Sequence, residues 1–468
     1  MASASTDGIA LQNIAQTSPG DPEHDLRLAI SVKGGSEVNG EYFQWYLGFL
    51  FNEFQQLPSD LRNAIVPATS RPPFTQFCAL LASVAKYLRE ESSVTLEDLY
   101  EGLSRLNPKS DDDSTGDEGA NVEPNDEDRM LVFQLIFIGI GFLTHIYKPA
   151  YEPSCGKLQI ASLGGPLRAS RDRAWRLSEI PIQHESTLTD LLLQLGNFGT
   201  LRTNGPLPRP HREPSLLAFS EQDALRATHL SYYSITKLAD ITIDWVDCVA
   251  EHLEFDRRLR VLKLYRFPSF CALLCSSDPE KTFLCRFMND YCADVRVSGN
   301  SAGPNPAADP VFSGLYLREI IATYRLFFGQ DKPSRKALQQ DLKRGTDKER
   351  ERVRFDPLLL RLCTKDWTDE CVFEHLDIPD VRTVYSATID FPFLMHKMIT
   401  LQEYIITQQP TGWSSLWRDR RDPARFWGLF AVIAFGVASI LLSLVQIALS
   451  GAQVASIDFS STSRNATT

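Results

Sequence analysis

Phe426 to Leu449 reads FWGLFAVIAFGVASILLSLVQIAL, without a charged residue. At about 1.5 Å of rise per residue, a helix of this length covers the roughly 30 Å hydrocarbon core of a bilayer. A core helix of a soluble protein normally carries a polar stripe, whereas the polar side chains here are only Ser439, Ser443 and Gln446. The sequence therefore predicts one transmembrane helix over 426–449, in a single-pass membrane protein.

The residues on either side of this helix predict its orientation. Segment 411–425 is basic, whereas segment 450–468 carries one arginine and one aspartate. The positive-inside rule predicts that the N-terminal side of the helix is cytoplasmic. The basic residues that support this orientation are Arg418, Arg420, Arg421 and Arg425. Lipid recognition by the same arginines is the alternative. The aromatic side chains expected at the membrane interface are Trp413, Trp417 and Trp427.

The end of the sequence suggests how the chain is inserted and modified. Segment 450–468 is expected to be a short lumenal or extracellular tail, inserted like that of a tail-anchored protein. The secretory pathway is favoured over the mitochondrial outer membrane, and the organelle stays open. Asn465 opens a glycosylation sequon, which also arises by chance. Small residues spaced four apart permit close helix approach and a homodimer, namely Ala434 with Ala438 and Ser439 with Ser443.

Composition limits the classes of protein to consider. The chain has 468 residues, 43% hydrophobic content and a net charge of −11. These values are ordinary for a globular protein and argue against general nucleic-acid binding, which needs a basic surface. The nine cysteines form an odd set within apolar runs, which indicates reduced core residues rather than a disulfide framework. Without a secretory signal at its start, the body is expected in the cytosol.

The hydrophobic pattern of the cytoplasmic body, 39–410, predicts a mainly α fold with a small β element. Apolar residues at helical spacing predict helices over 41–57, 74–88, 96–106, 188–199, 315–328 and 399–405, and 332–354 is a charged helix or linker. Thr95 and Asp98 form a start signal like a capping box. Strand 241–246 and a hairpin of 253–256 with 261–267 are the only strands expected. Residues 1–38 and the acidic loop 107–129 are expected to be disordered.

A second apolar run, Met130 to Tyr147, reads MLVFQLIFIGIGFLTHIY. Its length lies between that of a core helix and that of a membrane span. A span here would force an acidic N-terminal segment of about 129 residues, which has no secretory signal, across the membrane. We therefore predict a buried core helix.

Three patterns suggest chemistry, and each has a simpler reading. Ser301 lies in a G-x-S-x-G sequence, but the proline-rich stretch that follows cannot start the helix that a nucleophile elbow needs. Four cysteines, Cys271, Cys275, Cys285 and Cys292, lack the paired spacing of a zinc site and read as buried thiols. His252, near Cys248 and Asp256, reads as a structural histidine. The sequence predicts no catalytic residue, cofactor or metal.

Several short stretches together resemble a family of uncharacterised filamentous-fungal single-span membrane proteins. They are SRPPF at 70–74, HLEFD at 252–256, LKLYRFPSFC at 262–271, YRLFFGQ at 324–330 and WRDRRDP at 417–423, followed by the C-terminal apolar helix. The resemblance covers most of the chain and implies a single-span protein. It implies no activity, because none is assigned to that family.

The sequence thus favours a non-enzymatic interaction or scaffold protein, held in the lipid bilayer and recruiting an unknown protein partner. One alternative is an enzyme whose active-site residues come together only in space. Another is a membrane-tethered DNA-binding factor, which would need a basic face around Arg257, Arg258 and Arg260.

Overall fold

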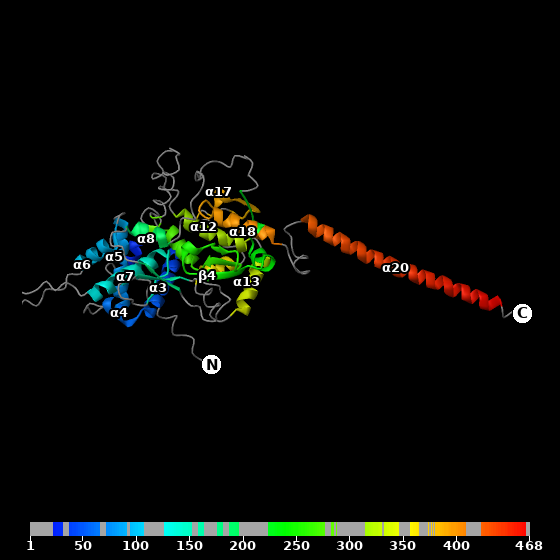
Figure 1. Ribbon diagram of the computed structural model, residues 1–468, viewed down its shortest axis with the longest axis horizontal. Helices are drawn as coiled ribbons and strands as arrows, with labels where there is room; N and C mark the ends of the chain where they lie inside the picture. Colours follow the sequence, from blue (N-terminus) through cyan, green and yellow to red (C-terminus); the bar gives the residue numbers. More distant parts are fainter. Residues whose placement is uncertain are drawn as a thin grey trace, which may run out of the picture. The chain divides into compact units, whose positions relative to one another are not determined.

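A computed structural model describes most of the elements of the chain (Figure 1). Its described residues are 22–30, 37–65, 72–90, 94–106, 126–151, 158–162, 176–180, 187–195, 223–276, 282–284, 314–329, 332–345, 356–364, 380–408 and 423–464, with single positions at 287, 373, 376 and 378. The chain divides into two compact units, one of Met1–Thr236 with Asp240–Thr407 and one of Lys237–Ala239 with Gln408–Thr468. The first is called the body below.

The described part of the body is mainly helical, as the periodicity predicts. Several helices begin at a proline, whose fixed φ and missing N–H suit the first helical position. The helices of the N-terminal half are α2 (Pro22–Ala29), α3 (Glu37–Gln56), α4 (Ser59–Ile65), α5 (Pro73–Glu90), α6 (Leu96–Leu106), α7 (Asp126–Thr144) and α8 (Leu188–Leu195). Those of the C-terminal half are α9 (Ala227–Leu230), α10 (Pro268–Ser276), α12 (Leu315–Tyr324), α13 (Lys332–Arg344), α15 (Pro357–Thr364), α17 (Ala387–Asp390) and α18 (Met395–Thr407). Short π-helices are η3 (Ser234–Leu238) and η7 (Arg325–Gly329), and η4 (Val249–Glu251) is a 3-10 helix.

The strands form small sheets among these helices. The predicted strand and hairpin are present as β4 (Thr242–Val246), β5 (Phe255–Asp256) and β6 (Val261–Tyr265), in the order β4-β6-β5. β5 and β6 pair antiparallel, while β4 pairs parallel with β6. The expectation of no further strands is wrong, because β1 (Leu158–Ser162) pairs with β2 (Arg176–Ile180) and β3 (Ala224–Arg226) with β7 (Val384–Ser386). These strands are short, or join residues far apart in sequence, so no local signal marks their pairing.

Helix α7 is the core helix predicted from the second apolar run. Its residues Ile136, Ile138 and Ile140 are fully buried, and α4, α5 and α6 pack against it. The capping box ahead of α6 is also confirmed, since the Asp98 N–H donates to the Thr95 hydroxyl and the Thr95 N–H donates to the Asp98 carboxylate. The prediction of a buried helix over 130–147 is therefore correct in kind and close in its bounds.

Two segments expected to be disordered contain helix. In the tail 1–38, α2 packs on α5 and buries Leu26 completely, because apolar residues recur on one face of this short helix. The acidic loop expected over 107–129 ends before Asp126, where α7 begins. The rest of that loop lies outside the described residues.

One buried carboxylate links two helix starts near the centre of the body. Asp356 lies just before α15, and its oxygens accept the N–H groups of Leu358 and Leu359. They also accept both the N–H and the hydroxyl of Ser269 in α10. Burial raises the pKa of Asp356 to about 6, although each of these hydrogen bonds lowers it. Asp356 therefore satisfies donors at the N-termini of both helices.

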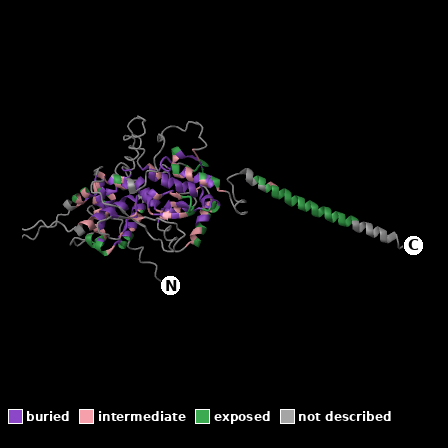
Figure 2. Ribbon diagram, in the orientation of Figure 1, coloured by how far each residue is buried: buried purple, intermediate pink, exposed green. Residues whose placement is uncertain are grey.

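Helix α20 (Pro423–Arg464) is the apolar helix predicted near the end of the sequence. Its segment Phe430–Gln453 is long and apolar enough to cross a membrane, and none of it is buried by protein (Figure 2). The apolar segment lies close to the predicted 426–449, and the helix itself continues into the expected tail 450–468, as far as Arg464. Residues 450–464 contain no proline to stop it.

Candidate functional site

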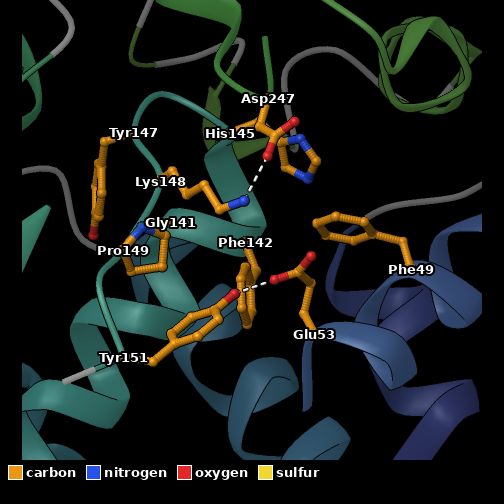
Figure 3. A pocket seen from close by; sticks show the side chains of 10 residues that line it. All are labelled: Phe49, Glu53, Gly141, Phe142, His145, Tyr147, Lys148, Pro149, Tyr151 and Asp247. Atoms are coloured by element: carbon orange, nitrogen blue, oxygen red, sulfur yellow. Dashed lines mark hydrogen bonds and ion pairs between the residues drawn. The ribbon is translucent and has the colours of Figure 1, made fainter. Parts of the chain in front are cut away.

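A small pocket in the body gathers charged, aromatic and histidine side chains (Figure 3). Helix α3 contributes Phe49 and Glu53, and the C-terminal end of α7 contributes Gly141 and Phe142. The chain that leaves α7 passes along the pocket, and Asp247 enters from the end of β4. The residues from that chain are His145, Tyr147, Lys148, Pro149 and Tyr151. Gly141 is required by this close approach, because a Cβ there would lie 2.9 Å from Pro149 Cδ.

Asp247 is the centre of the charge network. Its carboxylate lies 2.7 Å from Lys148 Nζ and also accepts a hydrogen bond from Arg266 Nε. Burial alone would raise the pKa of Asp247, but the two cations reverse this and lower it to about 2. Asp247 is therefore ionised at neutral pH, and both of its neighbours depend on it for charge compensation.

Glu53 and Tyr151 form a second interaction on the opposite side of the pocket. The Tyr151 hydroxyl donates to the Glu53 carboxylate. The pKa of Tyr151 is raised mainly by burial and in addition by the negative charge of Glu53. The pKa of Lys148 is raised because the attraction of Asp247 and Glu53 outweighs burial, which lowers it. Two acids and two bases, Glu53 and Asp247 with Lys148 and Arg266, therefore occupy neighbouring positions.

His145 is held in an unusual conformation inside an aromatic enclosure. Its φ is 51°, a left-handed value that non-glycine residues seldom adopt. The ring stacks on Phe270 with centroids 4.0 Å apart, and Nδ1 lies 2.8 Å from the Tyr265 hydroxyl. Burial lowers the pKa of His145 to about 3, so the imidazole is neutral. Its Nε2 is buried without a hydrogen-bond partner in the described part of the chain.

The size of the pocket decides what this arrangement can do. It leaves a cavity of about 20 Å³ for the centre of a water molecule, and such a cavity holds about one water. The charged groups already bind one another, and the imidazole is neutral and buried. The arrangement therefore fits a buried polar network that fixes the exit of α7 against α3 and β4, with room for a water but not for an organic substrate.

The residues considered for chemistry from the sequence do not join this pocket. His252 is fully buried elsewhere; its Nδ1 accepts the Tyr265 N–H and its Nε2 lies 2.9 Å from the Thr323 hydroxyl. It has the partners expected of a structural histidine. Cys248, Cys271 and Cys275 are buried thiols, as predicted. Among the described residues no group of three or more histidine, cysteine or acidic side chains could hold a metal.

Other sequence predictions lie wholly or partly outside the described residues. The residues outside are Ser301, Cys285, Cys292, Arg418, Arg420, Arg421, Trp413, Trp417 and Asn465. For Arg425 the structure describes only the helical backbone. Trp427 is described and 64% exposed on α20, so its interface role stays a prediction. The Lys148–Asp247–Arg266 network was missed. Its members follow α7, β4 and β6, and no spacing rule joins Lys148 to an aspartate 99 positions later in the chain.

No family model, curated protein or solved structure matches the chain. The resemblance to the fungal single-span family therefore stays a prediction.

Proposed function

We propose that the protein is a membrane-anchored interaction protein, whose helical body is displayed on the cytoplasmic face of a membrane and recruits a protein partner. The observation that carries the proposal is the exposure of α20. Within it, Val432, Phe435 and Ile447 are about 70% exposed or more. A continuous apolar surface of this size is costly in water and inexpensive in a bilayer.

The body supports a separate role for the anchor. Its core is built from its own helices, and its second apolar helix, α7, is already covered by protein. The orientation is argued from the sequence alone. The arginines before the apolar segment of α20 favour the cytoplasmic side for the body. The core of the body is complete without Phe430–Gln453, so this apolar segment is free to serve as an anchor.

The pocket does not favour catalysis as the role of the body. Its acids and bases are paired with one another, and its cavity has room for about one water. Catalysis on an organic substrate requires a concave site that buries much of the ligand. The network is better explained by the rigidity it gives to the body that is displayed.

The anchor is tested by fractionation and topology mapping of the full chain. We expect it to resist alkaline carbonate extraction, and a variant lacking 426–453 to become soluble with an unchanged thermal unfolding midpoint. Glycosylation reporters at the N-terminus, within 107–125 and after Arg464 are expected to be modified only after Arg464. Release of the full chain by carbonate, or modification at the other two positions, would contradict the proposal.

Recruitment is tested by proximity labelling in cells. The full chain is compared with a control that carries residues 411–468 fused to an unrelated soluble protein, so that both sample the same membrane. We expect proteins labelled by the full chain alone, and direct binding of at least one of them to the purified protein. Identical labelling by both chains would show that the body recruits nothing.

A further inference from the structure

The turn between β5 and β6 carries a concentrated positive charge. Asp256 to Arg260 reads DRRLR, and all its residues are exposed. The Asp256 carboxylate accepts the N–H groups of Arg258 and Leu259, which fixes the turn. Leu259 is 41% exposed. The turn therefore presents a leucine flanked by arginines on an ordered backbone.

Most acidic groups near this turn are already engaged. Glu251 and Glu254 bind Lys263, 2.8 and 2.9 Å away, and Asp240 lies 3.4 Å from Arg260. Arg257 and Arg258 have no acidic partner within 4 Å among the described residues. The whole chain has a net charge of −11 and would therefore repel an anionic partner. The arginines of this turn can attract one locally.

The turn also lies beside the end of the body from which the chain leads to α20. The Phe255 ring packs on Tyr404 with centroids 4.8 Å apart, and Tyr404 is in the last turn of α18, which ends at Thr407. The connecting segment 408–422 reaches at most about 50 Å when fully extended. A turn tethered over this length meets the membrane surface at high effective concentration.

We infer that the Asp256–Arg260 turn is a lipid-contacting surface, with its arginines on anionic phospholipid headgroups and Leu259 inserted at the level of the headgroups. The inference rests on the proposed anchoring by α20. Arginine binds phosphate through a planar fork of donors, and basic residues close to a membrane gain energy from the negative cytoplasmic leaflet. A single leucine adds apolar contact without committing the turn to the hydrocarbon core.

The test uses the full chain reconstituted in vesicles, with a photoreactive benzoylphenylalanine in place of Leu259. We expect crosslinks to lipid in vesicles of phosphatidylcholine with phosphatidylserine, and at least fivefold fewer in phosphatidylcholine alone or in high salt. Arg257→Glu, Arg258→Glu and Arg260→Glu together are expected to reduce the anionic-vesicle signal at least fivefold, the order expected for losing even one such contact.

Two matched controls separate this surface from the rest of the body. The same probe at Leu28, which is 55% exposed, is expected to crosslink little lipid. The triple variant Lys332→Glu, Lys336→Glu and Arg344→Glu on α13 changes the charge equally and is expected to leave the Leu259 signal unchanged. Equal crosslinking at Leu28, or equal loss with the α13 variant, would overturn the inference.

Flotation of the same samples distinguishes the two proposals. If the chain floats with vesicles but Leu259 acquires no lipid, the turn is not a lipid contact and the anchor still stands. If the chain fails to float, the proposed function itself is wrong. Low-salt binding of duplex DNA that is lost with the three arginine changes, without lipid crosslinking, would favour nucleic acid as the partner and overturn the lipid assignment.

Discussion

Helices α7 and α20 are both strongly apolar, yet they have opposite surroundings. Ile138 in α7 is fully buried by protein, whereas Ile440 in α20 is 63% exposed. The apolar part of α7 spans Arg129–Thr144, which is shorter than Phe430–Gln453, and other helices pack along it. The difference shows that apolar character alone does not assign a helix to a membrane; length and available protein partners decide.

The largest effect is expected from an aspartate placed in each helix. Ile138→Asp buries an unpaired charge and should destabilise the body by about 5 kcal/mol or more, or prevent folding. Ile440→Asp should leave the thermal unfolding midpoint of the body unchanged and weaken insertion by about 3 kcal/mol. Thermal unfolding in detergent and vesicle flotation measure the two quantities. A body destabilised equally by both changes would show that α20 belongs to its core.

Breaking the charge network at the end of α7 should also act on the body alone. Asp247→Ala leaves Lys148 and Arg266 without their shared carboxylate, at a cost of about 3–5 kcal/mol. Denaturant unfolding measures the loss, and flotation of folded protein should not change. A loss below about 1 kcal/mol would indicate that water compensates both cations and that the network is not structurally important.

Acid should remove the stability that the neutral form of His145 gives to the body. The folded pKa of His145 is about 3, below its unfolded value of about 6.5. The unfolded chain therefore binds the proton first, and stability is lost as pH falls from about 6.5 towards 3, by up to about 1.4 kcal/mol per unit. His145→Asn tolerates the left-handed backbone and should remove one proton from this dependence. An unchanged slope of stability against pH would contradict the assignment.

The smallest effect is expected at the start of α6. Thr95→Ala removes the hydroxyl that accepts the Asp98 N–H, 3.1 Å away, and should cost about 1 kcal/mol. Thr95→Ser keeps the hydroxyl and should restore most of the stability. A shift in the denaturation midpoint measures both variants, and an equal loss in the serine variant would mean that the methyl group, rather than the cap, is responsible.

Local signals explain how much of the fold was predictable. The spacing of Phe74, Phe77 and Leu81, the Thr95–Asp98 cap and the β5–β6 hairpin depend on residues close in sequence, and the structure contains all of them. The pairing of β3 with β7 joins residues about 160 apart. The Lys148–Asp247 contact likewise depends on packing between distant elements. Neither has a periodicity that a sequence could reveal.

The candidate site was therefore less predictable than the fold. His145 could be seen only as the end of an apolar run, and its left-handed backbone arises because the chain must turn sharply after α7 to reach Pro149. Asp247 followed a predicted strand, but its two basic partners were unknown until the strands were paired. Long-range packing decided both positions.

The length of α20 bears on what happens beyond the bilayer. The helix continues from Gln453 to Arg464, which at about 1.5 Å per residue extends some 16 Å past the apolar segment. The tripeptide that begins at Asn465 follows directly on this rigid extension. If α20 spans the membrane in the proposed orientation, the extension acts as a spacer between the bilayer and the predicted glycosylation sequon that follows it in the sequence.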